Sequence, residues 1–574
     1  MLHHGGDDSR LGNFTVKTLV AALEKIPDAP DSWMRFIGFG ADEYFFTYRQ
    51  LYAEARRRAA HLTIHHGLKK GDRLVLMTNE AHEFVMSFLG CVMAGIIPAP
   101  ISPPMLAKGG DTLAPAAARI VQNSQASVLL TTESSKPFAE QILEQTNGKT
   151  RLLTMETAFA EPAPSFEPPQ IQPEDICFLQ YTSGSTTLPR GVMVSHGNLM
   201  ANMRGFMGQH GMYPGPEDVG VSWLPLYHDM GLIGFILGPL VYIGPVVVLS
   251  TSSFARDPRL WLKTLHKYRG TITYAPNFAY AQVVKRLRDS DLENLDLSCV
   301  RIAGCGAEPI QAATLRSFAE RLAATGFRAE AFLPSYGMAE STLAITLHKP
   351  GSPIRTEFIN ADELKRGKAI LATEGNGREF VSCGFPLAEH HLTIVNELGE
   401  PLPDREVGEI VFRGPSVTQG YFQNPDATAA TWRDGWLHTG DLGYLADGEL
   451  FVCGRSKELI IIRGSNYYPQ DIEWALRDVP GIKRGNVVAF SITGNAGSIG
   501  DGTDERLVLI AEADAREDAE SLRQAIRVKV LESVGLEVFH VVLAPGGTLQ
   551  RTTSGKLQRR KMKQLFEQGE IAEM

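Results

Sequence analysis

The sequence lacks several features that would point to particular classes of protein. Its six cysteines are scattered and form no C-x-x-C pair, so a zinc site is not expected, and the thiols should be reduced and mostly buried in a cytoplasmic protein. The N-terminal stretch MLHHGGDDSR has no apolar centre, which argues against a signal peptide. A formal net charge of -9 over 574 residues provides no basic field for nucleic acid.

Uninterrupted apolar runs are also missing. Phe84–Met105 and Gly231–Ser250 approach the length of a membrane span, but proline and glycine interrupt both. Each stretch predicts a short helix followed by a buried strand. We therefore expect core elements here and no membrane span.

What is present is a regular alternation of helix and strand patterns from about residue 45 to residue 380. Residues 48–62 have the period of an amphipathic helix, residues 72–77 read as a strand, and residues 82–95 read as the next helix. This alternation predicts an α/β fold around a largely parallel sheet. After Gly384, shorter strands separated by turns predict a smaller β-rich subdomain.

A further compact α/β unit begins at Ser456 and includes a predicted helix over Ala519–Val534. We predict a large domain over residues 1–455 and a C-terminal domain over residues 456–574. The junction GRSK is too short for a tether and is typical of a hinge.

An unusual loop lies in YTSGSTTLPRGVMVSH, from Tyr181 to His196. Five hydroxyl side chains surround Gly184, and a β-like pattern resumes after Arg190, so the loop should join strand to strand. It is not the G-x-x-x-x-G-K-[ST] phosphate loop, which opens a helix. Hydroxyls, backbone N–H groups and a permissive glycine nevertheless suit polyphosphate oxygens.

Seven further motifs follow this loop in order. They are WLPLYHDMGLIG (Trp223–Gly234), TYAPNFAYA (Thr273–Ala281), GCGAEPI (Gly304–Ile310), LPSYGMAESTLA (Leu333–Ala344), GWLHTGDLGYL (Gly435–Leu445), GRSKELIIIRGSNYYPQDIE (Gly454–Glu473) and RTTSGKLQR (Arg551–Arg559). Together they resemble the adenylate-forming superfamily of acyl-CoA synthetases, nonribosomal peptide adenylation domains and luciferases. The resemblance covers nearly the whole chain. It implies two α/β subdomains and a small β-rich subdomain in the large domain, a mobile α+β C-terminal domain, and the use of ATP and Mg²⁺.

The resemblance assigns nucleotide-binding roles to the first half of these motifs. The phosphate loop corresponds to Thr182, Ser183, Gly184, Ser185, Thr186 and Arg190, although the family usually has Gly and Lys where this chain has Thr187 and Arg190. The adenine side corresponds to Gly306, Ala307, Glu308 and Pro309, and to Ser335, Tyr336, Gly337, Met338 and Ala339, with Tyr336 stacking on the base. Glu340 corresponds to the carboxylate that holds Mg²⁺, an ion that uses one or two carboxylates beside phosphates.

Later motifs supply the remaining roles. By resemblance, Asp441 binds both ribose hydroxyls, Arg455 lies near the ribose and phosphate, and Lys457 marks the hinge. Lys556 corresponds to the lysine between the attacking carboxylate and the transferring phosphate, where an ammonium offsets the repulsion of two anions. A surface lysine in a basic tail is the alternative reading of Lys556. The family often has Pro-Lys at Gln550-Arg551.

The acyl side is less specified by the sequence. His228 is expected to line the cleft and gate the acyl pocket rather than act as a base, because a carboxylic acid is already ionised at neutral pH. A buried structural histidine is the alternative. Met230, Leu232 and Phe278 are candidates for the pocket wall, and ordinary core packing is an equal alternative for each.

The amino-acid sequences of the motifs resemble those of the fatty acyl-AMP ligases, and so does the presence of a long segment between Glu340 and Ser382. This branch makes acyl-AMP from a medium- or long-chain fatty acid and passes the acyl group to an acyl carrier protein. In this branch, an insertion near this segment disfavours the conformation that uses CoA. A surface excursion without effect is the alternative for this segment.

Three other functions are alternatives. A long-chain acyl-CoA synthetase shares every nucleotide motif. A non-catalytic adenylate sensor conflicts with the retention of Glu340, Asp441, Arg455 and Lys556. Amino-acid activation would need an acid where TYAPNFAYA has none.

Overall fold

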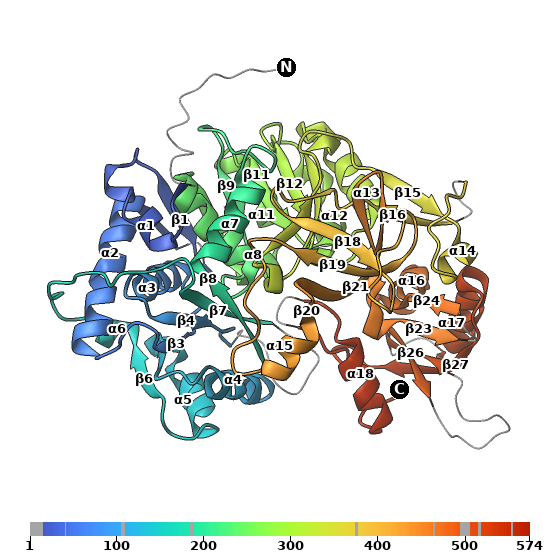
Figure 1. The fold of residues 1–574 in the computed structure, drawn as a ribbon. Coiled ribbons are helices and arrows are strands. Elements are labelled where there is room, and N and C mark those ends of the chain that lie inside the picture. Colours follow the sequence, from blue (N-terminus) through green and yellow to red (C-terminus); the bar gives the residue numbers. More distant parts are fainter. Residues whose placement is uncertain are drawn as a thin grey trace. The chain divides into compact units, whose positions relative to one another are not determined.

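The computed structural model describes residues 15–40, 42–104, 110–182, 189–373, 377–462, 465–493, 505–514, 518–552 and 555–574. The chain forms two compact units, whose elements are labelled in Figure 1. The first unit comprises Met1–Arg355, Val381–Leu392 and Phe412–His438, and the second comprises Thr356–Phe380, Thr393–Val411 and Thr439–Met574. The predicted domain boundary between residues 455 and 456 stays a prediction.

A nine-stranded sheet forms the centre of the first unit, in the order β17-β14-β13-β12-β11-β9-β10-β1-β2. The six strands from β13 to β1 are parallel, and the outer pairs are antiparallel. The strands are β1 (Trp33–Ile37), β2 (Glu43–Thr47), β9 (Gly220–Ser222), β10 (Val246–Leu249), β11 (Ile272–Ala275), β12 (Ile302–Cys305), β13 (Phe332–Gly337), β14 (Ala344–Leu347) and β17 (Phe385–Pro386). Every residue of β10, β11 and β12 is buried, as expected for parallel strands covered on both faces.

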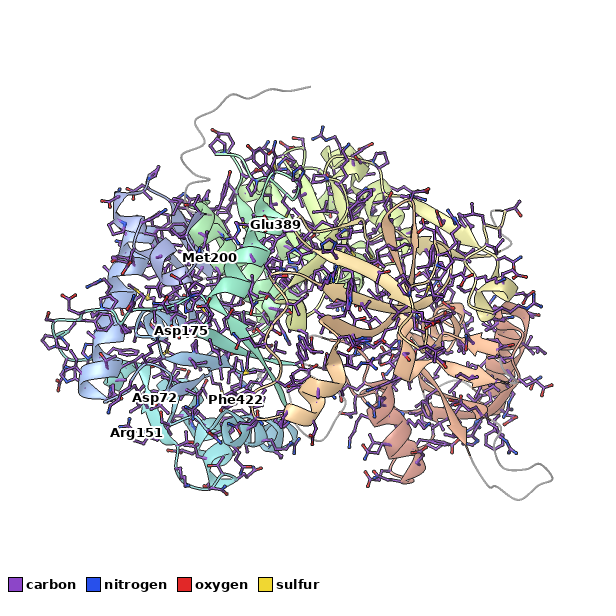
Figure 2. The ribbon with its side chains drawn as sticks, in the orientation of Figure 1. Asp72, Arg151, Asp175, Met200, Glu389 and Phe422 are labelled. Carbon is purple, nitrogen blue, oxygen red and sulfur yellow. The ribbon has the colours of Figure 1, made fainter. Side chains whose placement is uncertain are left out.

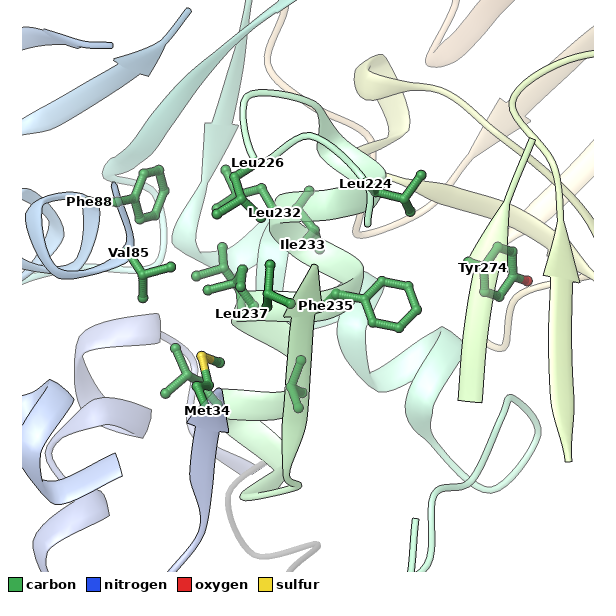
Figure 3. Packing of buried hydrophobic residues seen from close by; sticks show 14 of the residues in the cluster. Met34, Val85, Phe88, Leu224, Leu226, Leu232, Ile233, Phe235, Leu237 and Tyr274 are labelled. Atoms are coloured by element: carbon green, nitrogen blue, oxygen red, sulfur yellow. The ribbon is translucent and has the colours of Figure 1, made fainter. Parts of the chain in front are cut away.

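Helices connect these strands and pack on the sheet, and Figure 3 shows part of the resulting core. They are α1 (Leu19–Leu23), α7 (His196–Met207), α8 (Asp229–Leu232), α9 (Gly238–Tyr242), α10 (Thr251–Arg256), α11 (Arg259–Lys267), α12 (Asn277–Arg286) and α13 (Ala312–Leu322). The stretch from Gly231 to Ser250 forms α8, a π-helical turn, α9 and then buried β10. The sequence prediction of helix followed by buried strand is confirmed.

A second, fully parallel sheet in the first unit has the order β4-β3-β5-β6. Its strands are β3 (Arg73–Leu76), β4 (Ile97–Pro100), β5 (Val128–Thr131) and β6 (Arg151–Thr154), and its helices are α2 (Tyr48–Ala60), α3 (Ala81–Met93), α4 (Gly110–Ser124), α5 (Lys136–Glu144) and α6 (Met155–Ala158). The predicted alternation of helix and strand is therefore confirmed. The hairpin β7 (Ile176–Thr182) and β8 (Arg190–Ser195) follows.

The second unit contains β-rich and α/β parts. A five-stranded sheet joins β18 (His391–Val395), β19 (Gly408–Arg413), β21 (Trp436–Ala446), β20 (Trp432–Arg433) and β22 (Glu449–Arg455), and the chain passes between the units within β18, β19 and β21. β20 and α15 (Pro425–Thr431) belong to the first unit. The remaining elements are β15 (Thr356–Ile359), α14 (Ala361–Lys365), β16 (Arg378–Val381), β23 (Ile460–Ile462), β24 (Ser465–Tyr467), α16 (Pro469–Ala475), β25 (Ile482–Thr493), β26 (Glu505–Ala513), α17 (Ala519–Val534), β27 (Val538–Ala544) and α18 (Arg559–Glu567). The bounds of α17 are those predicted from the sequence.

The cysteines and the apolar helices bear on two further expectations from the sequence. All six cysteines are free thiols, and five of them are buried while Cys299 is half-buried. Among the described parts of the chain, no helix has the length and apolar character needed to cross a membrane.

Candidate active site

The predicted site residues of the first unit gather where the parallel strands end. The motif around His228 follows β9, Phe278 follows β11, Gly306 follows β12, and Glu340 follows β13. Because β9, β11, β12 and β13 are parallel, their carboxyl ends lie at one edge of the sheet. This is the edge at which open α/β sheets bind ligands.

The turn Gly306–Pro309 follows β12 and contacts residues of the two neighbouring segments, Ser335 in β13 and Phe278 after β11. A side chain at Gly306 would place its Cβ 2.8 Å from Ser335 Oγ, and Ala307 has a left-handed φ of 69°. Glu308 Oε1 accepts a hydrogen bond of 2.6 Å from the backbone N–H of Phe278, while Pro309 is exposed. The turn therefore fixes the end of β12 to the start of α12, where an acyl-pocket residue was predicted.

Glu340 lies in a short 3₁₀ turn, Ala339–Ser341, and is buried. Thr342 follows with a φ of 76°, which lies outside the backbone conformations that residues other than glycine usually adopt. Its hydroxyl donates to the backbone oxygen of Ser416 at 2.7 Å. The backbone N–H and the hydroxyl of Thr418 both donate to Glu340 O, at 3.0 and 2.9 Å. Residues 416–418 thus hold the backbone that presents the Glu340 carboxylate.

The Glu340 side chain is itself oriented by a tyrosine. Tyr421 donates its hydroxyl hydrogen to Glu340 Oε1 at 2.7 Å. Burial, and after it the Glu340 charge, raise the pKa of Tyr421, so its hydroxyl stays a donor. Glu340 Oε2 accepts no hydrogen bond from the other residues that the structure describes. A carboxylate that is held in one orientation and has Oε2 as a possible ligand suits Mg²⁺, because this ion completes its coordination with phosphates and waters.

Arg190 belongs to the same group. Its guanidinium carbon lies 5.2 Å from the centre of the Tyr421 ring, within the range of a cation–π contact. The two segments are joined along their backbones, because Phe422 N–H donates to Gly191 O at 2.7 Å and Met193 N–H donates to Gly420 O at 3.0 Å (Phe422 is labelled in Figure 2). The structure therefore brings Arg190 and Glu340 to one tyrosine.

The hydroxyl-rich loop connects β7 to β8, as the sequence predicted. Thr182 pairs with Arg190 and Tyr181 with Gly191 in an antiparallel register. A Cβ at Gly191 would lie 2.8 Å from the Tyr181 ring, so glycine is needed at this position. Ser183, Gly184, Ser185 and Thr186 lie outside the described residues.

The predicted adenine segment, Ser335–Ala339, covers the last three residues of β13 and the two residues after it. Ser335, Tyr336 and Gly337 are half-buried in β13, and Tyr336 and Met338 pack against a cluster that contains Ile345, Phe412 and Leu437. A Cβ at Gly337 would lie 2.0 Å from Leu343 O. Ala339 is buried in the main core. Stacking of Tyr336 on a base stays a prediction.

The acyl-side candidates differ in their surroundings. His228 is half-buried and precedes α8, with its ring 4.9 Å from that of Tyr227. Met230 and Phe278 are half-buried at the border of the core, whereas Leu232 is fully buried among neighbouring core residues (Figure 3). Gln180, a residue that the sequence did not single out, fixes this segment to β7 by donating to Tyr227 O at 2.9 Å.

Asp441 and Arg455 form a pair in the second unit. They are opposite each other in the β21–β22 ladder, and Arg455 Nε lies 3.0 Å from Asp441 Oδ1. Asp441 is 7% exposed, and Lys457 lies in the exposed turn after Arg455. The pair thus joins a buried carboxylate to a solvent-exposed guanidinium.

Lys556 is carried by a tight hairpin loop. Thr552 N–H donates to Lys556 O at 2.8 Å, and Lys556 N–H donates to Thr552 Oγ1 at 3.1 Å. Gly555, with φ 87°, allows the reversal before Lys556. This arrangement differs from that of a lysine in a basic helix face, because α18 starts only at Arg559.

The part of the long segment from Thr356 to Phe380 belongs to the second unit. Glu357 on β15 accepts two hydrogen bonds from Arg405, of 3.0 and 2.9 Å. Arg378 Nη1 lies 2.8 Å from Asp471 Oδ2 on α16, and burial raises the pKa of Asp471 to about 6 while Arg378 opposes the rise. The segment is therefore anchored to both the β-rich part and α16.

Comparisons with known proteins agree with this geometry. Residues 27–422 match the model of the AMP-binding enzyme family. A putative acyl-CoA synthetase of Caulobacter vibrioides is 38% identical over 87% of this chain and 86% of its own length. The medium-chain-fatty-acid–[acyl-carrier-protein] ligase JamA of Moorena producens is 32% identical over 92% of this chain and 90% of its own length.

Solved structures give the same result. A structure from work on fatty acyl-adenylate ligases of E. coli and L. pneumophila has a TM-score of 0.90 and 36% identity, covering 97% of this chain and 99% of that chain. The mixed α/β fold is that of the adenylate-forming enzymes. The chain belongs to the AMP-binding enzyme family, in the branch of the fatty acyl-AMP ligases.

Proposed function

We propose that this protein activates a medium- or long-chain fatty acid with ATP, forming acyl-AMP and releasing pyrophosphate. The observation that carries the proposal is the Arg190–Tyr421–Glu340 group at the carboxyl edge of the sheet, in a chain that matches AMP-binding enzymes. A carboxylate oxygen of the fatty acid bonds to the α-phosphorus of ATP. The bond between that phosphorus and the bridging oxygen to the β-phosphate breaks, and pyrophosphate takes the electron pair.

The residues of the chain divide this task. The β7–β8 loop and Arg190 would hold the β- and γ-phosphates, and Tyr421 would keep Glu340 turned toward them. Glu340 would bind Mg²⁺, whose charge offsets that of the departing pyrophosphate. Gly306–Pro309 and Ser335–Ala339 would line the adenine, with Tyr336 stacked on the base. Asp441 and Arg455 would take the ribose, and Lys556 would stabilise the charge that develops between the two anions.

The proposed acceptor of the acyl group is the phosphopantetheine thiol of an acyl carrier protein. The thiolate attacks the acyl carbon, and AMP leaves from the mixed anhydride. JamA, a relative over nine-tenths of the chain, is named for such a carrier. The long segment supports the same acceptor, because its contacts with Arg405 and Asp471 would restrain the change to the CoA-using conformation that the family resemblance leads us to expect. We expect the reaction to take place in the cytoplasm.

An acyl-CoA synthetase is the second candidate, because a relative at 38% identity is named as a putative enzyme of that class. The experiment that decides uses ATP, Mg²⁺ and radiolabelled dodecanoic acid, with CoA, a carrier protein in its phosphopantetheinylated form, or neither. We expect acyl-AMP to accumulate without an acceptor, to persist with CoA, and to be consumed by the carrier. Formation of acyl-CoA would favour the synthetase, and no release of pyrophosphate would refute adenylation itself.

A further inference from the structure

The guanidinium group of Arg551 connects the loop that carries Lys556 to strand β25. Arg551 Nη1 donates to Gly555 O, the carbonyl directly before Lys556, at 2.9 Å. Its Nη2 donates to Asn486 Oδ1 on β25 at 3.1 Å. Arg551 also pairs along the backbone with Leu557 on the far side of the loop. Arg551 therefore contacts the loop on both sides of Lys556.

Asn486, the partner of Arg551 on β25, is in turn hydrogen-bonded to the buried carboxylate of Glu512. Asn486 Nδ2 donates to Glu512 Oε2 at 2.6 Å, and Glu512 on β26 is only 3% exposed. Glu512 Oε1 accepts from the backbone N–H groups of Gly547 and Leu549, at 2.8 and 2.9 Å. Three donors thus compensate the burial of this charge. The anchor is a fixed part of the domain.

The chemistry of the three side chains gives the bridge one direction. A carboxylate accepts only, and a guanidinium donates only, so the amide between them must turn its NH₂ toward Glu512 and its oxygen toward Arg551. Since the Asn486 amide can satisfy both neighbours in one orientation alone, the bridge also defines the orientation of Arg551. The planar guanidinium then holds Gly555 O through a second, fixed N–H group.

We propose that Arg551 is a positioning residue for Lys556, held in place by the Glu512–Asn486 pair. The inference rests on the proposed role of Lys556 in adenylate formation. Arg551 fixes the loop so that the ammonium is presented in one place, and it does not touch ATP. Lysine at this position would donate to Gly555 O or to Asn486, but its single ammonium lacks the fork that reaches both.

The test compares Arg551→Ala and Arg551→Lys with Arg527→Ala, which removes an arginine with a weak ion pair to Glu520 at 4.0 Å in the same domain. Adenylate formation is measured by pyrophosphate release, and amide hydrogen exchange is measured across residues 548–558. We expect Arg551→Ala to lower kcat by at least tenfold with KM for ATP within twofold, and Arg551→Lys to lose less. The exchange of the 548–558 peptide should accelerate in Arg551→Ala. Arg527→Ala should match the unaltered protein in both measurements.

Transfer of the acyl group from supplied acyl-AMP to the carrier serves as the check on folding, and we expect it to be unchanged in both Arg551 variants. Normal adenylate formation by Arg551→Ala would overturn the proposal. So would a large rise in KM for ATP without a change in exchange, since that result would make Arg551 a direct phosphate contact. If the unaltered protein forms no adenylate, the proposed function fails, and unchanged exchange in Arg551→Ala would separately refute the positioning role.

Discussion

The Tyr421 hydroxyl donates to the Glu340 carboxylate across 2.7 Å, although the two residues are 81 positions apart in the chain. A hydrogen bond to a charged group is worth more than one between neutral groups, and here both partners are buried. The bond fixes one carboxylate oxygen and leaves the other to a ligand. Tyr421 should therefore control how well Glu340 holds a cation.

For Tyr421→Phe, we expect the Mg²⁺ concentration at half-maximal adenylation to rise by about tenfold, since a hydrogen bond to a charge contributes about 1.5–3 kcal/mol. The measurement is the initial rate of pyrophosphate release against Mg²⁺ concentration. Tyr444→Phe is the matched control, because Tyr444 donates to Glu357, another buried glutamate, at 3.3 Å. Equal Mg²⁺ dependence in both variants would contradict the role of Tyr421.

For Lys556→Ala, we expect acyl-AMP formation to fall by a factor on the order of 10²–10³, the usual loss when one charge-stabilising donor is removed from a site. Binding of ATP, measured by calorimetry, should largely persist. Lys561→Ala removes an exposed lysine from the same basic segment and should have no effect. Adenylate formation at the normal rate by Lys556→Ala would return Lys556 to the status of a surface residue.

For Arg378→Ala, we expect acyl-CoA to appear where the unaltered protein makes little, because the 2.8 Å pair with Asp471 no longer ties the long segment to α16. The product ratio of acyl-CoA to acyl-AMP is the measurement. Arg366→Ala breaks a 2.8 Å pair with Glu363 inside the same segment and serves as the control. A ratio that stays the same in both variants would remove the segment from the account of acceptor choice.

Arg559 joins two acidic residues in the second unit, with 2.7 Å contacts to Glu458 and to Glu473. Since these side chains are largely buried, we expect Arg559→Met to destabilise the protein by about 3–5 kcal/mol, because two carboxylates lose their cation. Urea unfolding followed by fluorescence measures the change, with Lys561→Met as an exposed control. A loss of less than 1 kcal/mol in the free energy of unfolding would mean that water solvates the two carboxylates in place of the arginine.

His196 should make the protein less stable in acid. Burial lowers its pKa to about 4, and its Nδ1 accepts the backbone N–H of Leu19 at 3.2 Å. The unfolded chain binds a proton near pH 6.5 that the folded protein excludes, so stability is lost as pH falls from 6.5 to 4, by about 3 kcal/mol in total. His196→Asn should flatten the slope of unfolding free energy between these pH values. An unchanged slope would assign the acid sensitivity to other groups.

Much of the fold was predictable because it depends on local patterns. The period of apolar residues identified α2, α3 and α17, and proline and glycine identified the breaks in the two apolar stretches. The hairpin around the hydroxyl-rich loop also followed from the β-like pattern on either side of it. Such signals require only neighbours in the chain.

The sequence by itself determined which chemical groups are present and in what order, and the family resemblance rests on that order. Only the tertiary structure decided that Tyr421 orients Glu340, that Arg378 pairs with Asp471, and that Glu512 anchors the Lys556 loop through Asn486 and Arg551. Tyr421, Arg378, Glu512 and Asn486 lie outside the motifs and have no local signature, since a tyrosine after a glycine or an asparagine in a strand is common. Their roles arise from contacts between segments far apart in the chain, which packing creates and periodicity does not encode.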